Sequence, residues 1–127
     1  MNIKAEHTHI RCQDLEAAVQ WYERVMNGKI LRRGEVPGMS IVRMDVGGQV
    51  LALSPKREEM TVEAFSGKPQ WGVWQLAYEV DDIEKAYQEM KSKGAKFKKE
   101  PFQQTPAAKV AFVDAPDGVE IELLEFA

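Results

Sequence analysis

Two short stretches near opposite ends of the chain carry the side chains best suited to chemistry. His7, His9 and Arg11 follow one another at every second position, and Glu120 and Glu122 have the same spacing. Because successive side chains of a β-strand point to opposite faces, each set shares one face of its strand. Imidazole and carboxylate groups bind divalent metal ions and transfer protons. The spacing indicates metal binding or acid–base chemistry, and a solvent-exposed polar sheet face is the alternative explanation.

The first half of the chain predicts the order β-α-β-β-β. Residues 3–12 alternate as in a strand whose other face carries Ile10 and Cys12, so we interpret Cys12 as a small core residue. Asp14 is a good helix N-cap, and Gly28 is expected to end that helix in the left-handed conformation. Three further strands are expected at 29–36, 39–46 and 49–54.

The second half repeats this pattern. The offset is 68 residues from His7 to Gln75 and 70 residues from Ala52 to Glu122. A helix is expected from Asp81/Asp82 to Gly94, with strands at 73–80, 95–100, 107–113 and 119–126. We therefore expect one domain, 1–127, made of a first module (about 3–54), a linker (55–72) and a second module (about 73–126).

The repeat makes four positions equivalent in pairs. His7 corresponds to Gln75, and Ala52 corresponds to Glu122. A pseudo-twofold axis between the modules would bring all four together. Three of them offer an imidazole, an amide oxygen and a carboxylate, which are ligand types for Zn, Ni, Mn, Co or Fe. In the linker and just after it, Met60, Phe65, Trp71 and Trp74 are expected either to line an apolar pocket or to pack the linker down.

Length and charge restrict the possible partners. A chain of 127 residues with a net charge of −3 and a pI near 5.5 is one ordinary domain without the basic excess of nucleic-acid-binding proteins. No apolar run approaches the ~20 residues of a membrane span, and no signal-peptide pattern opens the chain. Its single cysteine cannot form an internal disulfide. We expect a cytoplasmic protein with a small-molecule substrate and no nucleic-acid or membrane partner.

Three segments give the chain a resemblance to the vicinal oxygen chelate superfamily, which includes glyoxalase I, methylmalonyl-CoA epimerase, extradiol dioxygenases and bleomycin-resistance proteins. The segments are His7–Leu15, Trp21-Tyr22-Glu23 and Val113–Glu125, the last containing a D-x-P-D-G turn before a Glu-containing strand. The chain is most similar to small glyoxalase I enzymes, whose first strand also runs H-T-x-x-R. The resemblance implies an α+β fold of two tandem β-α-β-β-β modules, each a curved sheet with one packed helix, and a homodimer.

The resemblance also implies a divalent metal held between the modules. His7 and Glu122 match the family's ligands, Gln75 replaces the usual histidine, and Ala52 stands where glyoxalase I has a carboxylate. His9 offers an alternative set of ligands with His7 and Glu122. The implied metal is Zn, Ni, Mn, Co or Fe, or none if the two departures abolish binding.

The function implied is that of a metalloenzyme similar to lactoylglutathione lyase. It would act on a small α-oxo or hydroxy-carbonyl compound, or its thiol conjugate, by Lewis-acid stabilisation of an enediolate, with Glu122 as the base. Arg11 matches the arginine that holds the glutathione carboxylate, and Trp74 and Ser54 are further candidate substrate contacts. The alternative is a metal-free binding protein of the bleomycin-resistance type. A third possibility is an epimerase or an extradiol-type dioxygenase.

Overall fold

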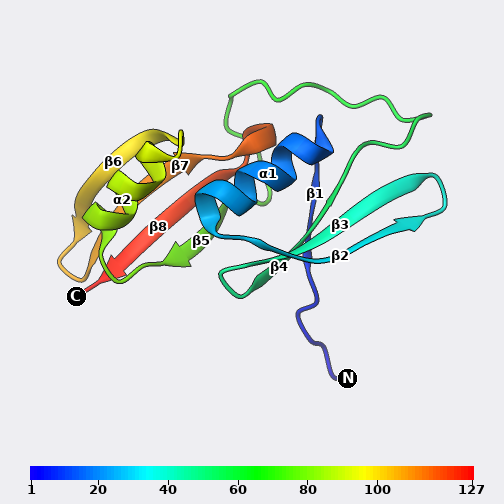
Figure 1. Cartoon of the computed structure of the whole chain (residues 1–127). Helices are drawn as coiled ribbons and strands as arrows, with labels where there is room; N and C mark the ends of the chain where they lie inside the picture. The colour runs from blue at the N-terminus through cyan, green and yellow to red at the C-terminus, as the bar shows by residue number, and fades with distance from the viewer. The chain divides into compact units, whose positions relative to one another are not determined.

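The chain forms two compact units that share one architecture. The computed structural model describes residues 1–127 and divides them into Met1–Ala64 and Phe65–Ala127. Each unit contains one four-stranded sheet and one α-helix (Figure 1). The predicted α+β fold of two β-α-β-β-β modules is confirmed. Neither helix has the length and hydrophobicity of a membrane-spanning segment.

The first unit has the sheet order β1-β4-β3-β2, with β1 and β4 parallel. Its elements are β1 (Thr8–Arg11), α1 (Leu15–Met26), β2 (Lys29–Val36), β3 (Met39–Val46) and β4 (Gln49–Ser54). The three strands after the helix have the predicted bounds. The first strand is shorter than the predicted 3–12, because its pairing starts at Thr8 with Leu51 and β4 extends only two residues further in that direction.

The second unit repeats this order as β5-β8-β7-β6. Its elements are β5 (Gln75–Glu79), α2 (Ile83–Ser92), β6 (Lys96–Thr105), β7 (Ala108–Asp114), a 3-10 turn (Pro116–Gly118) and β8 (Glu120–Phe126). β6 continues past the predicted end at 100 because it pairs only with β7, and an edge strand tolerates Pro101. β5 is shorter than the predicted 73–80.

The internal repeat extends to the pairing of individual residues in the two sheets. Thr8 pairs with Leu51 in the first unit, and Leu76 pairs with Ile121 in the second. These pairs are related by the same offsets, 68 and 70, that the sequence comparison gave. The two parallel strand pairs therefore present equivalent positions to equivalent faces.

The helix of each unit covers one face of its own sheet. Leu51, Leu53, Ile121 and Leu123 are fully buried, and α1 and α2 add their apolar stripes to the same cores. Cys12 is 2% exposed, which confirms it as a core residue. The apolar layer uses only one face of each sheet, so the polar residues predicted from the alternation are left on the other.

The first helix begins as predicted but ends differently. The side chain of Asp14 accepts a hydrogen bond from the Ala17 amide as the N-cap. The left-handed residue at the other end is Asn27 (φ 55°), not Gly28. Gly28 instead allows the chain to pass close to Tyr22 and Met44. A Cβ at this position would lie 3.0 Å from the Tyr22 carbonyl oxygen and 3.1 Å from Met44 Cε. In α2 the predicted terminator, Gly94, does adopt a positive φ of 91°.

Candidate functional site

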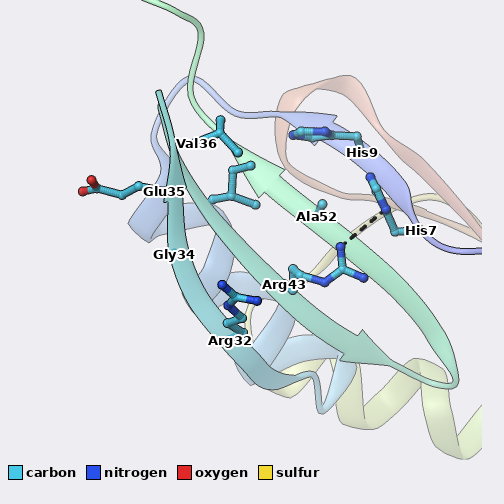
Figure 2. Close-up of a pocket in the computed structure, with 9 residues that line it drawn as sticks. His7, His9, Arg32, Gly34, Glu35, Val36, Arg43 and Ala52 are labelled. Atoms are coloured by element: carbon cyan, nitrogen blue, oxygen red, sulfur yellow. Dashed lines mark hydrogen bonds between the residues drawn. The ribbon is translucent and has the colours of Figure 1, made fainter. Parts of the chain in front are cut away.

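A single row of residues crosses the polar face of the first sheet. His9 pairs with Ala52, Ala52 pairs with Arg43, and Arg43 pairs with Arg32, so the row spans all four strands. Paired residues project from the same face of a sheet. Ala52 contributes only a methyl group, and the centre of the row is therefore hollow, with the histidines on one side and Arg43 on the other (Figure 2).

This hollow is a cavity of about 350 Å³, here called the Ala52 cavity. Its lining comes from all four strands and from the residue just before β1: His7, His9, Arg32, Gly34, Glu35, Val36, Ile41, Arg43 and Ala52. The side chain of Glu35 points away from Ala52 (Figure 2). The cavity thus combines an apolar floor with a predominantly basic wall.

A second cavity of about 350 Å³ lies on the other side of His9 in the same unit. It brings together Arg11 and Ser54, two of the predicted substrate contacts, with His9, Met39, Arg57 and Met60. Met60 of the predicted linker lines this cavity, but Phe65 and Trp71 do not, and most of the lining residues are polar. Trp74, the third predicted contact, is 69% exposed in the second unit and lines neither of these two cavities.

His7 is oriented by an acidic neighbour. Its Nδ1 lies 2.8 Å from Glu6 Oε1, and Arg43 Nη2 donates to the same oxygen over 2.6 Å. Arg43 Nη1 also lies 3.5 Å from His7 Nδ1 (Figure 2), but a guanidinium only donates and a carboxylate only accepts, so the two contacts cannot both be hydrogen bonds of a neutral ring. The shorter contact with Glu6 favours a proton on Nδ1, which in the neutral ring leaves the Nε2 lone pair for a metal or a substrate. Hydrogen bonds from His7 and Arg43 lower the pKa of Glu6.

His9 is committed to a different partner. Its Nε2 lies 2.7 Å from Ser54 Oγ, and the two imidazole rings, His7 and His9, meet edge to face at 5.7 Å between centroids. Partial burial and the neighbouring charges of His7 and Arg11 lower the pKa of His9. The contact with Ser54 occupies Nε2 of His9. In the alternative set of ligands, His7, His9 and Glu122, His9 would therefore have to bind the metal through Nδ1.

The second unit orients Gln75 in a comparable way. Gln75 Nε2 donates to Glu120 Oε2 over 2.6 Å, and Lys98 Nζ lies 3.1 Å from Glu120 Oε1. Glu120 is 6% exposed, so this network is held at a buried carboxylate. With the amide nitrogen committed, the amide oxygen of Gln75 is the atom left for a ligand role.

Glu122 lies on the same face of β8, one step further along. It is half-buried, pairs across the β5–β8 ladder with Ala77, and makes no hydrogen bond or ion pair. Neither unit alone gathers three His, Cys, Asp or Glu side chains that could hold a metal ion. The predicted set of ligands takes His7 from one unit and Gln75 and Glu122 from the other, and it stays a prediction.

Sequence reasoning missed the two arginines of the Ala52 cavity. Arg43 was detectable, because a two-residue turn at Gly47-Gly48 places it opposite Ala52. Arg32 was not detectable, because plain alternation cannot reveal the irregularity between Ile30 and Arg32 that sets its direction.

Comparisons with known proteins agree with this architecture. Residues 4–123 match the family model for the Glyoxalase/Bleomycin resistance protein/Dioxygenase superfamily. The chain is 30% identical over 129 residues to a lactoylglutathione lyase of Escherichia coli O157:H7, covering 94% of this chain and 90% of that protein.

Solved structures give the same result. Glyoxalase I from Zea mays superposes with a TM-score of 0.77 at 26% identity, covering 95% of this chain and 44% of the longer maize chain. A glyoxalase/bleomycin resistance protein/dioxygenase domain from Frankia superposes with a TM-score of 0.78 over the full length of both chains at 18% identity. With its paired modules and matching family pattern, this chain belongs to the Glyoxalase/Bleomycin resistance protein/Dioxygenase superfamily.

Proposed function

We propose that the chain is a glyoxalase-like, divalent-metal-dependent lyase or isomerase acting on a small α-oxo or hydroxy-carbonyl compound. The observation that carries this proposal is the orientation of two candidate ligands by carboxylates. Glu6 fixes the His7 ring, and Glu120 fixes the Gln75 amide. Partners of this kind, which hold a ligand by its other polar atom, are typical of metal-binding side chains.

The donor set fits a divalent transition metal. His7 would supply a nitrogen, and Gln75 and Glu122 would each supply an oxygen, which suits Zn, Ni, Mn, Co or Fe. Ala52 has no donor atom, so three protein ligands would leave positions for water or substrate oxygens. A bound ion would supply Lewis-acid polarisation of a carbonyl oxygen.

The same residues define the proton chemistry. Removal of a C–H proton beside a carbonyl needs a carboxylate that is not already engaged. Glu122 makes no hydrogen bond or ion pair within the chain, whereas both oxygens of Glu120 are occupied by Gln75 and Lys98. As a proposed metal ligand as well, Glu122 would have to serve as ligand and base by turns. Glu79 is exposed at the end of β5. Glu122 is therefore our candidate for the base.

The second cavity provides substrate contacts. Arg11 and Ser54 line it together with His9. The similarity to lactoylglutathione lyases makes a glutathione conjugate one candidate substrate, with Arg11 as the group that pairs with its carboxylate.

The deciding experiment is elemental analysis of purified, tag-free, dialysed protein. We expect close to one Zn, Ni, Mn, Co or Fe ion per chain, and substantial loss of that ion in His7→Ala and in Glu122→Gln with the fold retained. Glu79→Gln removes the same charge from an exposed position and should keep the metal. Full metal occupancy in both site variants would contradict the proposed ligands.

The second candidate function is metal-free binding of a small molecule. The absence of any donor atom at Ala52 favours it, because the site then carries a single negative charge. Wild-type protein that takes up no ion from an excess of each metal, yet retains an organic ligand through purification, would select this alternative.

A further inference from the structure

We propose that the Ala52 cavity binds a carboxylate group of the substrate through Arg32 and Arg43, so that the substrate is a small α-oxo acid rather than a neutral carbonyl compound. That the carboxylate belongs to the substrate rests on the proposed function. The preference of the cavity for an anion rests on the first unit alone.

The direction of Arg32 depends on a β-bulge. Ile30 pairs with Met44 and Arg32 pairs with Arg43, so Leu31 is an extra residue in β2. The extra residue reverses the alternation of everything that follows it. Arg32, Gly34 and Val36 line the cavity, whereas Arg33 reaches the opposite face and forms a two-point ion pair with Glu16 of α1.

The bulge leaves two cations directly opposite each other. Like charges at paired positions of an antiparallel ladder are destabilising. Arg32 makes no hydrogen bond or ion pair, and Arg43 is paired with the exposed carboxylate of Glu6. An exposed ion pair contributes little free energy, so Glu6 is a weak competitor for an incoming anion. A bound anion would relieve the repulsion that the bulge creates.

The cavity also has the space for an anion between its donors. Ala52 provides only a methyl group at the centre of the row, and Gly34 lies beneath the Arg32 guanidinium, whose Nε is 3.6 Å from where a Cβ would be. The one acidic residue of the lining, Glu35, points away from Ala52 (Figure 2). The histidines complete the wall, so every side chain directed inward is basic, small or apolar.

The form of the donors favours a carboxylate as the anion. A guanidinium presents a planar fork of N–H groups that matches the two oxygens of a carboxylate. Arg43 already binds a carboxylate in this structure, that of Glu6. His7 lines the same cavity and is a candidate metal ligand, so an α-oxo acid anchored here would have its carbonyl next to His7. Its negative charge would also replace the one lost at Ala52.

The test is calorimetric titration of metal-free, chelator-treated protein with pyruvate, the simplest α-oxo acid. We expect saturable binding with a Kd on the order of 1 mM. Arg32→Gln should weaken it about tenfold, as the loss of a charged hydrogen bond predicts. Arg33→Gln is the matched control, because it removes the same charge one residue away on the other face, and it should leave the Kd unchanged.

Two further measurements complete the test. Ala52→Glu should abolish pyruvate binding, because its carboxylate would occupy the arginines, and methyl pyruvate, the neutral ester, should not bind to wild-type protein. No saturation by about 20 mM pyruvate, or equal weakening by Arg32→Gln and Arg33→Gln, would overturn the site. Binding of inorganic phosphate without pyruvate would overturn the assignment to a carboxylate. Because no metal is present, failure here is distinguishable from failure of the metal site, which the elemental analysis measures.

Discussion

At the scale of single residues, Ala52 changes the chemistry of the site more than any other position. It removes a carboxylate from the predicted set of ligands and opens a cavity between His9 and Arg43. The position was identifiable from sequence, because the internal repeat and the family pattern both point to it. The cavity that Ala52 opens could not be predicted from the sequence. The residues paired with Ala52 on the neighbouring strands decide whether that space is filled.

Arg11 is expected to act on substrate binding rather than on turnover. Because it lines the second cavity beside Ser54, Arg11→Ala should raise the KM for a glutathione hemithioacetal about tenfold and leave the KM for a thiol-free substrate nearly unchanged. Steady-state kinetics on both substrates measures the difference. Arg57→Ala is the control from the same cavity, since Arg57 Nη1 is already bonded to the Pro37 carbonyl oxygen. Equal changes with both substrates would remove the role in glutathione binding.

At the scale of elements, the sequence correctly predicted the features that depend on neighbouring residues along the chain, namely helix N-caps and strand bounds. Asp14 and Asp82 both cap their helices as side-chain acceptors, and the strand bounds of β2, β3 and β4 agree with the prediction. The errors arose where tertiary context decides the outcome. Asn27 takes the left-handed position expected of Gly28, and Leu31 forms the bulge that directs Arg32 into the cavity.

Gly28 should therefore be sensitive to the smallest substitution. In Gly28→Ala the new methyl group would meet the Tyr22 carbonyl oxygen at 3.0 Å, a backbone atom that cannot rotate away. We expect a loss of about 1–3 kcal/mol in the free energy of unfolding, measured by urea denaturation. In Gly34→Ala the nearest atom is the flexible Arg32 side chain at 3.6 Å, so stability should be maintained. A stable Gly28→Ala protein would show that the close approach relaxes easily.

At the scale of the whole molecule, three large apolar side chains lie exposed within one four-residue segment, 71–74. Trp71, Val73 and Trp74 are 104%, 91% and 69% exposed, which is unusual for large apolar side chains so close together. The family resemblance implies a homodimer, and such side chains are typical of protein interfaces. We therefore predict that the contact of such a homodimer includes this segment.

Light scattering coupled to gel filtration measures this directly. We expect a mass twice the 14.4 kDa of one chain, and a shift toward the single-chain mass when Trp71 and Trp74 are both replaced by serine. Since both side chains are exposed, the double variant should keep its fold, which circular dichroism can verify. A double variant that stays fully dimeric would exclude this segment as the interface, and a monomeric wild type would exclude the dimer itself.

The bulge at Leu31 also has an evolutionary consequence. β2 is an edge strand in which only Gly34 is even partly buried, so a slip of one residue would disturb little of the core. After such a slip, Leu31 would stand opposite Arg43 in place of Arg32, and Arg33 and Glu35 would take the positions of Gly34 and Val36 in the cavity wall. An insertion or a displaced bulge in this strand can thus change which side chains line the cavity, and so the charge that a substrate meets, although no amino acid of the strand is substituted. Divergence of specificity by this route would pass unnoticed in a comparison that counts substitutions alone.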